Sequence, residues 1–254
     1  MDIGFRAFCE EVYAVQNRYT GDIGDFGKLG LLRQLSQTGL SIGVNWYLTP
    51  DEIHNGDGRH ISYLKNNAFH ACDAQLWSVL GEIVDSGKRE VSALERSDIL
   101  QATFYSKLLD FTGAGGSERQ TIRWEWHGRA MQQLQNCDIV FVDPDNGLMV
   151  PSANGTLKSN KFVLPFELVE YYRAGASVIY YQHKARRSDD FYIAQNRKLI
   201  ESGAFPQAAS LGFKFRTTSQ RYFFCLIHKE HVSAFSVCAD RIIKTPWNQH
   251  FSIL

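Results

Sequence analysis

The side chains with the clearest chemical potential lie in the segment Asp143-Pro144-Asp145-Asn146, which directly follows the apolar run Ile139–Val142. Pro144 cannot donate a hydrogen bond to a neighbouring strand, so the two carboxylates and the amide are expected to leave the sheet together. Carboxylate and amide oxygens accept hydrogen bonds from an amino group, and carboxylates are also preferred ligands of Mg²⁺. Asp-Pro and Asn-Gly also form ordinary turns. Two acids and an amide after a core strand nevertheless favour a catalytic role for these four residues.

A lysine near the start of a predicted helix is a second candidate. Asp25 is suited to cap a helix over 26–37, since an aspartate in front of an apolar run accepts hydrogen bonds from the first backbone N–H groups. Lys28 then lies one turn into the helix, where it could reach a carboxylate or a phosphate. Capping alone is a frequent structural role for Asp25, and it is the alternative to a binding role for this segment.

A loop that contains glycines follows the first predicted core strand, 40–48. Gly56, Asp57 and Gly58 lie in this loop, and glycines allow a ligand to approach the backbone closely. The loop lacks the Gly-x-Gly-x-x-Gly pattern of dinucleotide-binding turns. We therefore consider both a cofactor-binding loop and an ordinary solvent-exposed loop.

Five charged side chains near predicted strands are further candidates. Glu95 follows a predicted short strand, where it could bind the hydroxyl groups of a ribose. Glu125 stands between two tryptophans, where it could hold an amine beside a stacking ring. His183, Lys184 and Arg186 follow the last central strand, where they could contact phosphate or substrate. For each of them, a solvated surface position is the alternative.

The composition restricts the classes of protein to be considered. The 254 residues include 27 basic and 27 acidic side chains, so the whole chain lacks the positive field that concentrates nucleic acid. The five cysteines are scattered without a Cys-x-x-Cys pair, which argues against a disulfide framework and a structural zinc site. We expect a cytoplasmic protein without a membrane span, because no apolar run approaches the roughly 20 residues that a span requires.

Strand and helix patterns alternate along the chain, which predicts an α/β fold of three layers with an open, mostly parallel sheet. Runs 209–216 and 222–228 predict an antiparallel hairpin at a sheet edge. The chain 1–254 is expected to form one domain, in which a helical segment, 1–38, precedes the first core strand. The predicted strands are 40–48, 89–94, 138–142 and 177–181, and the predicted helices are 26–37, 73–86, 99–109, 129–134, 165–173 and 190–202.

The order of these motifs resembles a known enzyme family. The segment 21–28 in front of a strand, the loop Gly-Asp-Gly-Arg (56–59) and the run Val-Phe-Val-Asp-Pro (140–144) are similar to motifs of the ribosomal RNA adenine-N6 methyltransferases. That family carries a Gly…Ala-Asp…Lys-His helix, a Gly-x-Gly loop and an Asp-Pro-Pro-Tyr segment. The resemblance implies a Rossmann-like fold of the class I S-adenosylmethionine-dependent methyltransferases, whose sheet also ends in a hairpin.

The resemblance also implies roles for individual residues. S-adenosylmethionine would contact Lys28, the glycine loop and an acid near Glu125. Asp143 would accept hydrogen bonds from the exocyclic amine of a base in RNA or DNA. Asp145 and Asn146 stand where the family has its second proline and its aromatic residue, so a polar side chain replaces the usual stacking partner of a flipped base.

Three functions are consistent with these features. The first is methylation of a base amine by S-adenosylmethionine. The second is a Mg²⁺-dependent nuclease or phosphohydrolase in which Asp143 and Asp145 hold the metal and Lys184 stabilises charge on phosphate. The additional carboxylate of Asp145 favours this second function. The third is a catalytically inactive partner protein with a methyltransferase fold.

Overall fold

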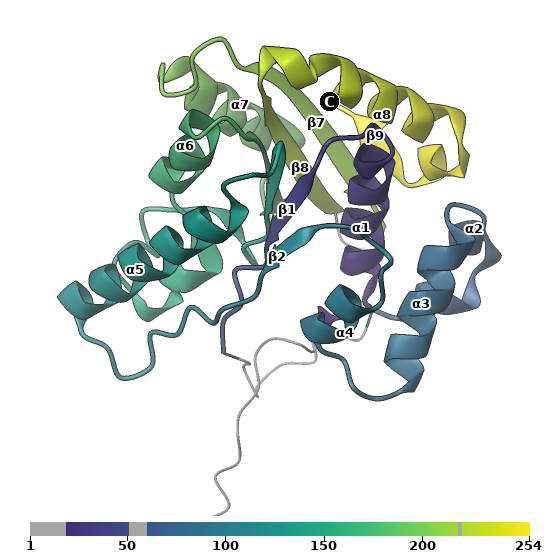
Figure 1. Cartoon of the computed structure of the whole chain (residues 1–254), viewed down its shortest axis with the longest axis horizontal. Helices are drawn as coiled ribbons and strands as arrows, with labels where there is room; N and C mark the ends of the chain where they lie inside the picture. Colours follow the sequence, from purple (N-terminus) through teal and green to yellow (C-terminus); the bar gives the residue numbers. More distant parts are fainter. Residues whose placement is uncertain (1–18, 51–59, 218–219) are drawn as a thin grey trace, which may run out of the picture.

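The computed structural model describes residues 19–50, 60–217 and 220–254. Strands of this part form a seven-stranded sheet in the middle of the molecule (Figure 1). A separate sheet has two short strands. The larger sheet contains β1 (Ile42–Asn45), β2 (Thr103–Tyr105), β3 (Ile139–Val142), β6 (Ser177–His183), β7 (Ala209–Arg216), β8 (Gln220–Ile227) and β9 (Phe251–Ile253), and the smaller sheet pairs β4 (Gly147–Leu148) with β5 (Phe162–Val163).

The strands of the larger sheet lie in the order β2-β1-β3-β6-β8-β7-β9. The first four run parallel, which confirms the predicted parallel sheet. β8 is antiparallel to both of its neighbours, so β7 runs parallel to β6 with an opposite strand between them. The predicted C-terminal hairpin is therefore confirmed. It does not form the edge of the sheet, however, because β9 pairs with the outer side of β7.

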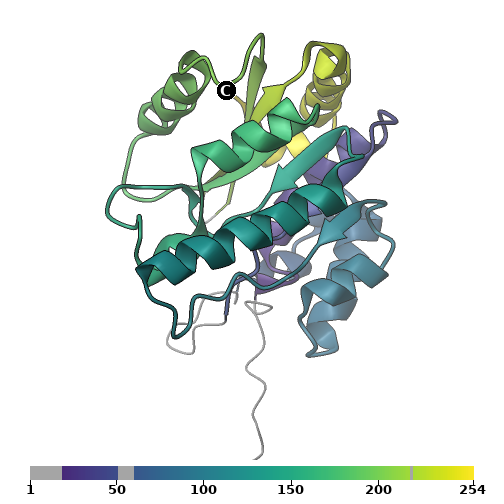
Figure 2. The same ribbon diagram turned by 60° about the vertical axis from the view of Figure 1, so that its left-hand side comes forward.

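Helices cover both faces of the sheet, which confirms the three-layer α/β architecture. In chain order the α-helices are α1 (Ile23–Ser36), α2 (Asn67–His70), α3 (Ala74–Asp85), α4 (Val91–Arg96), α5 (Gly116–Leu134), α6 (Pro165–Arg173), α7 (Asp189–Glu201) and α8 (Val232–Lys244). Figures 1 and 2 show α5, α6 and α7 on one face and α1 and α8 on the other. In the part of the chain that is described, no helix is both long and apolar enough to cross a membrane.

Helix α1 packs closely against its neighbours because glycines form part of its inner face. A side-chain carbon at Gly27 would lie 2.6 Å from the ring of Phe215, and one at Gly30 would overlap with the ring of Trp247. Neither ring can retreat easily, since both are buried. The glycines thus allow the helix, and with it Lys28, to lie close to the sheet.

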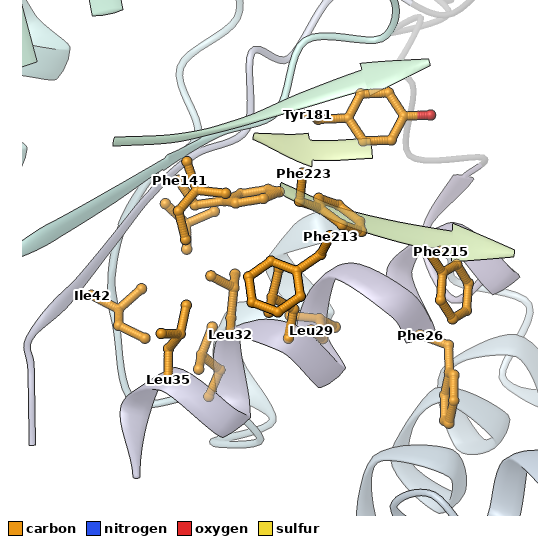
Figure 3. Packing of buried hydrophobic residues seen from close by; sticks show 14 of the residues in the cluster. Phe26, Leu29, Leu32, Leu35, Ile42, Phe141, Tyr181, Phe213, Phe215 and Phe223 are labelled. Carbon is orange, nitrogen blue, oxygen red and sulfur yellow. The ribbon is translucent and has the colours of Figure 1, made fainter. Parts of the chain in front are cut away.

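The apolar core has one half on each face of the sheet. On the α1 side, Phe141, Phe213 and Phe223 pack over Leu29 and Leu32 (Figure 3). The alternate strand residues pack against α5, α6 and α7 on the other face. Burial on both faces explains why the central strands are continuous apolar runs, and each such side chain contributes about 1.5–3 kcal/mol of transfer free energy.

Two of the predicted elements are wrong. Residues 91–96 form helix α4, although a strand was predicted over 89–94, and Leu94 is its one fully buried apolar side chain. Residues 103–105 form strand β2, although a helix was predicted over 99–109. Apolar spacing in short segments does not separate helix from strand. Pairing with β1 decides the second case, because it gives these residues a ladder of backbone hydrogen bonds.

Candidate functional site

A cavity of about 390 Å³ opens at the carboxyl ends of strands β1, β3 and β6. Ligands of open α/β sheets bind at this edge. The whole tetrapeptide 143–146 lines the cavity directly after β3, together with Lys28 of α1 and His183 at the end of β6. The fold therefore brings together six of the side chains predicted from the sequence, although α1 and β3 lie more than 100 residues apart in the chain.

The centre of the cavity wall is an ion pair between Lys28 and Asp143. Lys28 Nζ lies 2.5 Å from Asp143 Oδ2 and 3.1 Å from Asp25 Oδ1. Both Lys28 and Asp143 are largely buried. Within the described residues, Lys28 is the one hydrogen-bond donor to the Asp143 side chain. The second carboxylate oxygen of Asp143 can therefore accept a hydrogen bond from a ligand.

Burial and charge together set the protonation of this pair. Burial raises the pKa of Asp143 to about 6, because the attraction of the Lys28 ammonium offsets the loss of solvation only in part. Burial alone would lower the pKa of Lys28, but Asp143 and Asp25 raise it above its usual value. At neutral pH the pair is therefore ionised, and Asp143 acts as a hydrogen-bond acceptor.

The N-terminus of α1 adds two more carboxylates to the cavity wall. Asp22 is the capping residue, because its Oδ1 accepts from the backbone N–H groups of Gly24 (2.7 Å) and Asp25 (3.1 Å). The prediction that Asp25 caps this helix is thus wrong by one turn. Asp25 Oδ2 instead accepts from Gly21 N at 2.8 Å, and its other oxygen faces Lys28. Burial, and then the charge of Asp25, raises the pKa of Asp22.

One buried amide side chain holds the turn that carries the tetrapeptide. Gln182 Nε2 donates to the carbonyl of Asn146 at 2.9 Å, and its Oε1 accepts from Leu148 N at 3.0 Å. Gly147 has a φ of 102° and lies so close to Gln182 that any side chain there would overlap with the amide. The backbone N–H of Asn146 donates to the carbonyl of Lys161 at 3.0 Å. These contacts fix the positions of Asp143 and Asn146 relative to β6.

Aromatic rings form a further part of the wall. Lys28 Nζ lies 5.7 Å from the ring centroid of Trp46 and 5.9 Å from that of Tyr181. The Tyr181 hydroxyl lies 3.2 Å from His183 Nδ1, and burial raises the pKa of Tyr181 to about 12, so the phenol is neutral. Aromatic faces attract cations, and here both rings face the ammonium group of Lys28.

A second buried ion pair lies on the opposite face of the sheet, behind the cavity residue Tyr47. Arg123 of α5 makes two hydrogen bonds of 2.7 Å to Glu167 of α6. Arg123 also donates to the carbonyls of Ser159 (2.8 Å) and Phe162 (2.6 Å). The Tyr47 hydroxyl donates to Glu167 at 3.0 Å, which helps to hold Tyr47 at a φ of 49°. This pair is closed off from solvent and has the character of a structural anchor.

Glu95 and Glu125, the two acids predicted to bind the cofactor, lie outside the cavity wall. Glu95 is in α4, and its carboxylate accepts from Trp46 Nε1 at 3.1 Å. Glu125 is an exposed residue of α5, with its carboxylate 3.8 Å from Arg129. Neither is among the described residues that line the cavity. Glu95 contacts the cavity wall through Trp46, and Glu125 has no such link.

The predicted cations after β6 are next to the cavity rather than in its wall. Lys184 donates to Asp189 at the start of α7, and Arg186 is exposed in the loop between them. His183, directly before Lys184, does line the cavity. The predicted cofactor loop, Gly56, Asp57 and Gly58, lies outside the described residues.

Several residues of the wall were not predicted. They include Trp46, Tyr181 and Arg221. A signal for Arg221 was present, because it stands at the head of an apolar strand, where a buried cation must face a polar site. Trp46 and Tyr181 carried no such signal, since aromatic residues in predicted strands are usually core.

The two carboxylates considered for Mg²⁺, Asp143 and Asp145, each lie beside a lysine. The described residues contain no group of three or more His, Cys, Asp or Glu side chains placed to hold a metal ion. Asp143 is paired with Lys28, and Asp145 Oδ2 lies 3.8 Å from the Nζ of Lys161. Each of the two carboxylates considered for Mg²⁺ thus has an ammonium group beside it, which competes with a metal ion.

The sequence was also compared with known proteins. No model of a protein family matches the chain, and no curated protein matches it.

Proposed function

We propose that this chain is a methyltransferase-like enzyme that uses S-adenosylmethionine to methylate a base amine of nucleic acid. The strand order supports the proposal, because β8 runs antiparallel between β6 and the parallel strand β7. A Rossmann-like methyltransferase sheet ends in such a hairpin. A fold alone does not determine a function, so the proposal depends on the chemistry of the cavity.

The buried carboxylate of Asp143 is the observation that carries the proposal. It follows the central strand β3, lines the cavity and is bonded to Lys28 through one oxygen. In the methyltransferases that the motif order resembles, the acceptor of the base amine stands at this position. Pro144 has a backbone carbonyl and no N–H. The Asp-Pro pair thus offers acceptors to an incoming amino group without a competing donor.

The cavity suits S-adenosylmethionine in two respects. The carboxylates of Asp22 and Asp25 would attract its positive charges. The hydroxyl groups of Thr20 and Thr49, cavity residues that are each 1% exposed, have no hydrogen-bond partner among the described residues. Buried polar groups normally have partners, so a polar ligand would complete this wall.

The residues of the chain would act mainly by positioning. When bound, S-adenosylmethionine supplies an electrophilic methyl group. Lys28 keeps Asp143 ionised, and Asp143 accepts a hydrogen bond from the amine N–H, which orients the nitrogen lone pair. Gln182 holds the turn and so holds the acceptor in place. Correct orientation of two reactants can supply much of the acceleration of such a reaction.

Two measurements on the same preparations test the proposal. Calorimetry should detect binding of S-adenosylmethionine, and transfer of a labelled methyl group should be followed with RNA and with denatured DNA as acceptors. Asp143→Ala should retain cofactor binding and lose methyl transfer by at least about a hundredfold, because it removes the side-chain oxygens that accept hydrogen bonds from the amine. Asp240→Asn, on the exposed face of α8, is the control.

The outcomes separate the three functions. Cofactor binding with no transfer to any acceptor supports an inactive methyltransferase fold. Absence of cofactor binding, together with thermal stabilisation by Mg²⁺, supports the nuclease or phosphohydrolase and overturns our proposal. Equal methyl transfer by wild type and Asp143→Ala would remove Asp143 from the mechanism.

A further inference from the structure

A group of basic side chains lies at the ends of strands β6, β7 and β8, next to the cavity. Strand β6 ends at His183, which pairs with Arg221 at the start of β8, and Arg216 ends β7 opposite Gln220. These strand ends and the loop after β6 therefore lie at one edge of the sheet. Six basic side chains belong to them, against the two acids Asp189 and Asp190: Lys184, Arg186, Arg187, Lys214, Arg216 and Arg221.

The loop after β6, 184–188, is held in place by one acid. Asp189 accepts hydrogen bonds from Lys184, from Lys214 and, at 2.7 Å, from the Tyr222 hydroxyl. Hydrogen bonds from Lys184 and Lys214 lower the pKa of Asp189, so its carboxylate stays ionised and binds both lysines. In addition, Ala185 N donates to the Tyr192 hydroxyl at 2.8 Å. The loop is thus a fixed platform.

Two arginines project from this platform. Arg186 and Arg187 are exposed, and no described acid forms an ion pair with Arg186. The guanidinium carbon of Arg187 lies 5.4 Å from the ring centroid of Phe191, and Phe191 is 46% exposed. An exposed aromatic ring with an arginine on it, beside a cavity, is poorly explained by core packing.

We infer that this surface, Arg186, Arg187 and Phe191, docks single-stranded nucleic acid next to the cavity. Arginines that lack acid partners suit phosphates, and an exposed ring can stack a base of any sequence. Arg186 comes three residues after the cavity residue His183, so a strand bound at this surface would lead a neighbouring base to the cavity. The inference deepens the proposed function: it names an unpaired strand as the substrate and rests on that function for the chemistry.

Binding of labelled oligonucleotides tests the inference without any assay of catalysis. Fluorescence anisotropy would compare a 12-nucleotide RNA, the same DNA sequence and its duplex at several salt concentrations. Phe191→Ala should weaken single-strand binding by about tenfold with little change in salt dependence. Arg186→Ala should weaken it and reduce the slope of log affinity against log salt by about 0.7, which corresponds to one phosphate contact.

Matched controls lie at the other ends of the strands, away from the cavity. Lys229→Ala and Val232→Ala each remove an exposed side chain where β8 ends and α8 begins, and neither should change binding by more than about twofold. Tighter binding of RNA or of DNA identifies which strand is preferred. The inference is overturned if duplex binds as well as single strands, or if the control variants lose as much affinity as Phe191→Ala and Arg186→Ala.

Calorimetry with S-adenosylmethionine on the same variants separates this inference from the proposed function. Oligonucleotide binding that depends on Phe191, with no cofactor binding, supports the docking surface and contradicts the methyltransferase. Cofactor binding in a protein that ignores oligonucleotides supports the methyltransferase fold and contradicts the docking surface.

Discussion

Two buried ion pairs among the described residues, Arg123–Glu167 and Lys28–Asp143, lie on opposite faces of the sheet and differ in how many of their hydrogen bonds the protein supplies. Arg123 and Glu167 are joined by two hydrogen bonds, and neighbouring backbone carbonyls and a tyrosine hydroxyl take up their remaining capacity. Lys28 and Asp143 are joined by one hydrogen bond in a cavity wall. We call Arg123–Glu167 the closed pair, because all its hydrogen-bond partners lie within the protein. We call Lys28–Asp143 the open pair, because it keeps an acceptor for a ligand.

The difference between the two pairs shows that burial of charged residues does not by itself identify a functional site. Both pairs are buried and both are charged. A buried pair is costly to break, because the remaining partner then stays charged and unsolvated. A catalytic group must instead keep hydrogen-bonding capacity that the fold leaves unused. The raised pKa of Asp143 reflects that incomplete compensation, so the open pair is the better candidate for chemistry.

Breaking the closed pair should have the largest effect on stability. Arg123→Met removes the cation and leaves Glu167 buried without its partner, so the free energy of unfolding should fall by about 3–5 kcal/mol. Urea denaturation followed by circular dichroism measures this loss. Arg129→Met is the control, because its partner Glu125 is exposed and such pairs contribute about 0–1 kcal/mol. Equal losses in the two variants would show that Arg123 is not an anchor.

A methyl group at Gly147 should have the next largest effect, since it combines backbone strain with overlap. Gly147→Ala should lower the free energy of unfolding by about 2–4 kcal/mol. Gly155→Ala isolates the strain, because Gly155 also has a positive φ but open space around it, and it should cost about 1–2 kcal/mol. If the two variants lose the same stability, contact with Gln182 is not what holds the turn.

Removal of the cation from the open pair should cost less than removal from the closed one. Lys28→Met leaves Asp143 and Asp25 without their shared partner, but cavity water can solvate them, so we expect a loss of about 1–3 kcal/mol. Lys28→Arg keeps the charge and is the matched control. Urea denaturation of both variants beside Arg123→Met measures the difference. A loss in Lys28→Met as large as in Arg123→Met would mean that the two pairs do not differ.

The sequence was sufficient to predict the central layer of the fold. Asp138–Val142 and Ser177–Tyr181 are continuous apolar runs followed by polar residues, a pattern typical of strands covered on both faces. Prediction failed for 89–94 and 99–109, where the apolar residues are few and their spacing suits either structure. Pairing with β1 selects the strand at 103–105, and a partner distant in the chain cannot be inferred from local pattern.

The candidate site could be predicted only in part, because it too depends on contacts between distant segments of the chain. Asp143 and Lys28 carry local signals, namely a strand end and the first turn of a helix. No local signal indicated that they are in direct contact, because the contact depends on how closely α1 approaches the sheet at Gly27. The role of Gln182 in holding the turn could not be predicted either, since a polar residue at a strand end ordinarily faces solvent. Contacts between distant segments are set by packing and are only indirectly encoded in local sequence.

The smallest effect that separates the two pairs is the pH dependence of stability. The pKa of Asp143 is about 6 in the folded chain and about 4 in an unfolded one, so the folded state binds the proton more tightly. The stabilisation from this proton is complete below about pH 4 and is lost as pH rises through about 6. The slope is up to about 1.4 kcal/mol per pH unit. Urea denaturation of wild type and Asp143→Asn from pH 4 to 7.5 measures it.

Asp138, at the other end of the same strand, provides a control of opposite sign. Its hydrogen bond with Ser41 lowers the pKa of Asp138, so its stabilisation is present above its unfolded pKa and is lost as pH falls. Relative to wild type, Asp143→Asn should therefore gain stability as pH rises from 4 to 7, whereas Asp138→Asn should not. If the Asp143→Asn difference is flat over this range, the open pair is as well compensated as the closed one, and Asp143 has no unused capacity to offer a ligand.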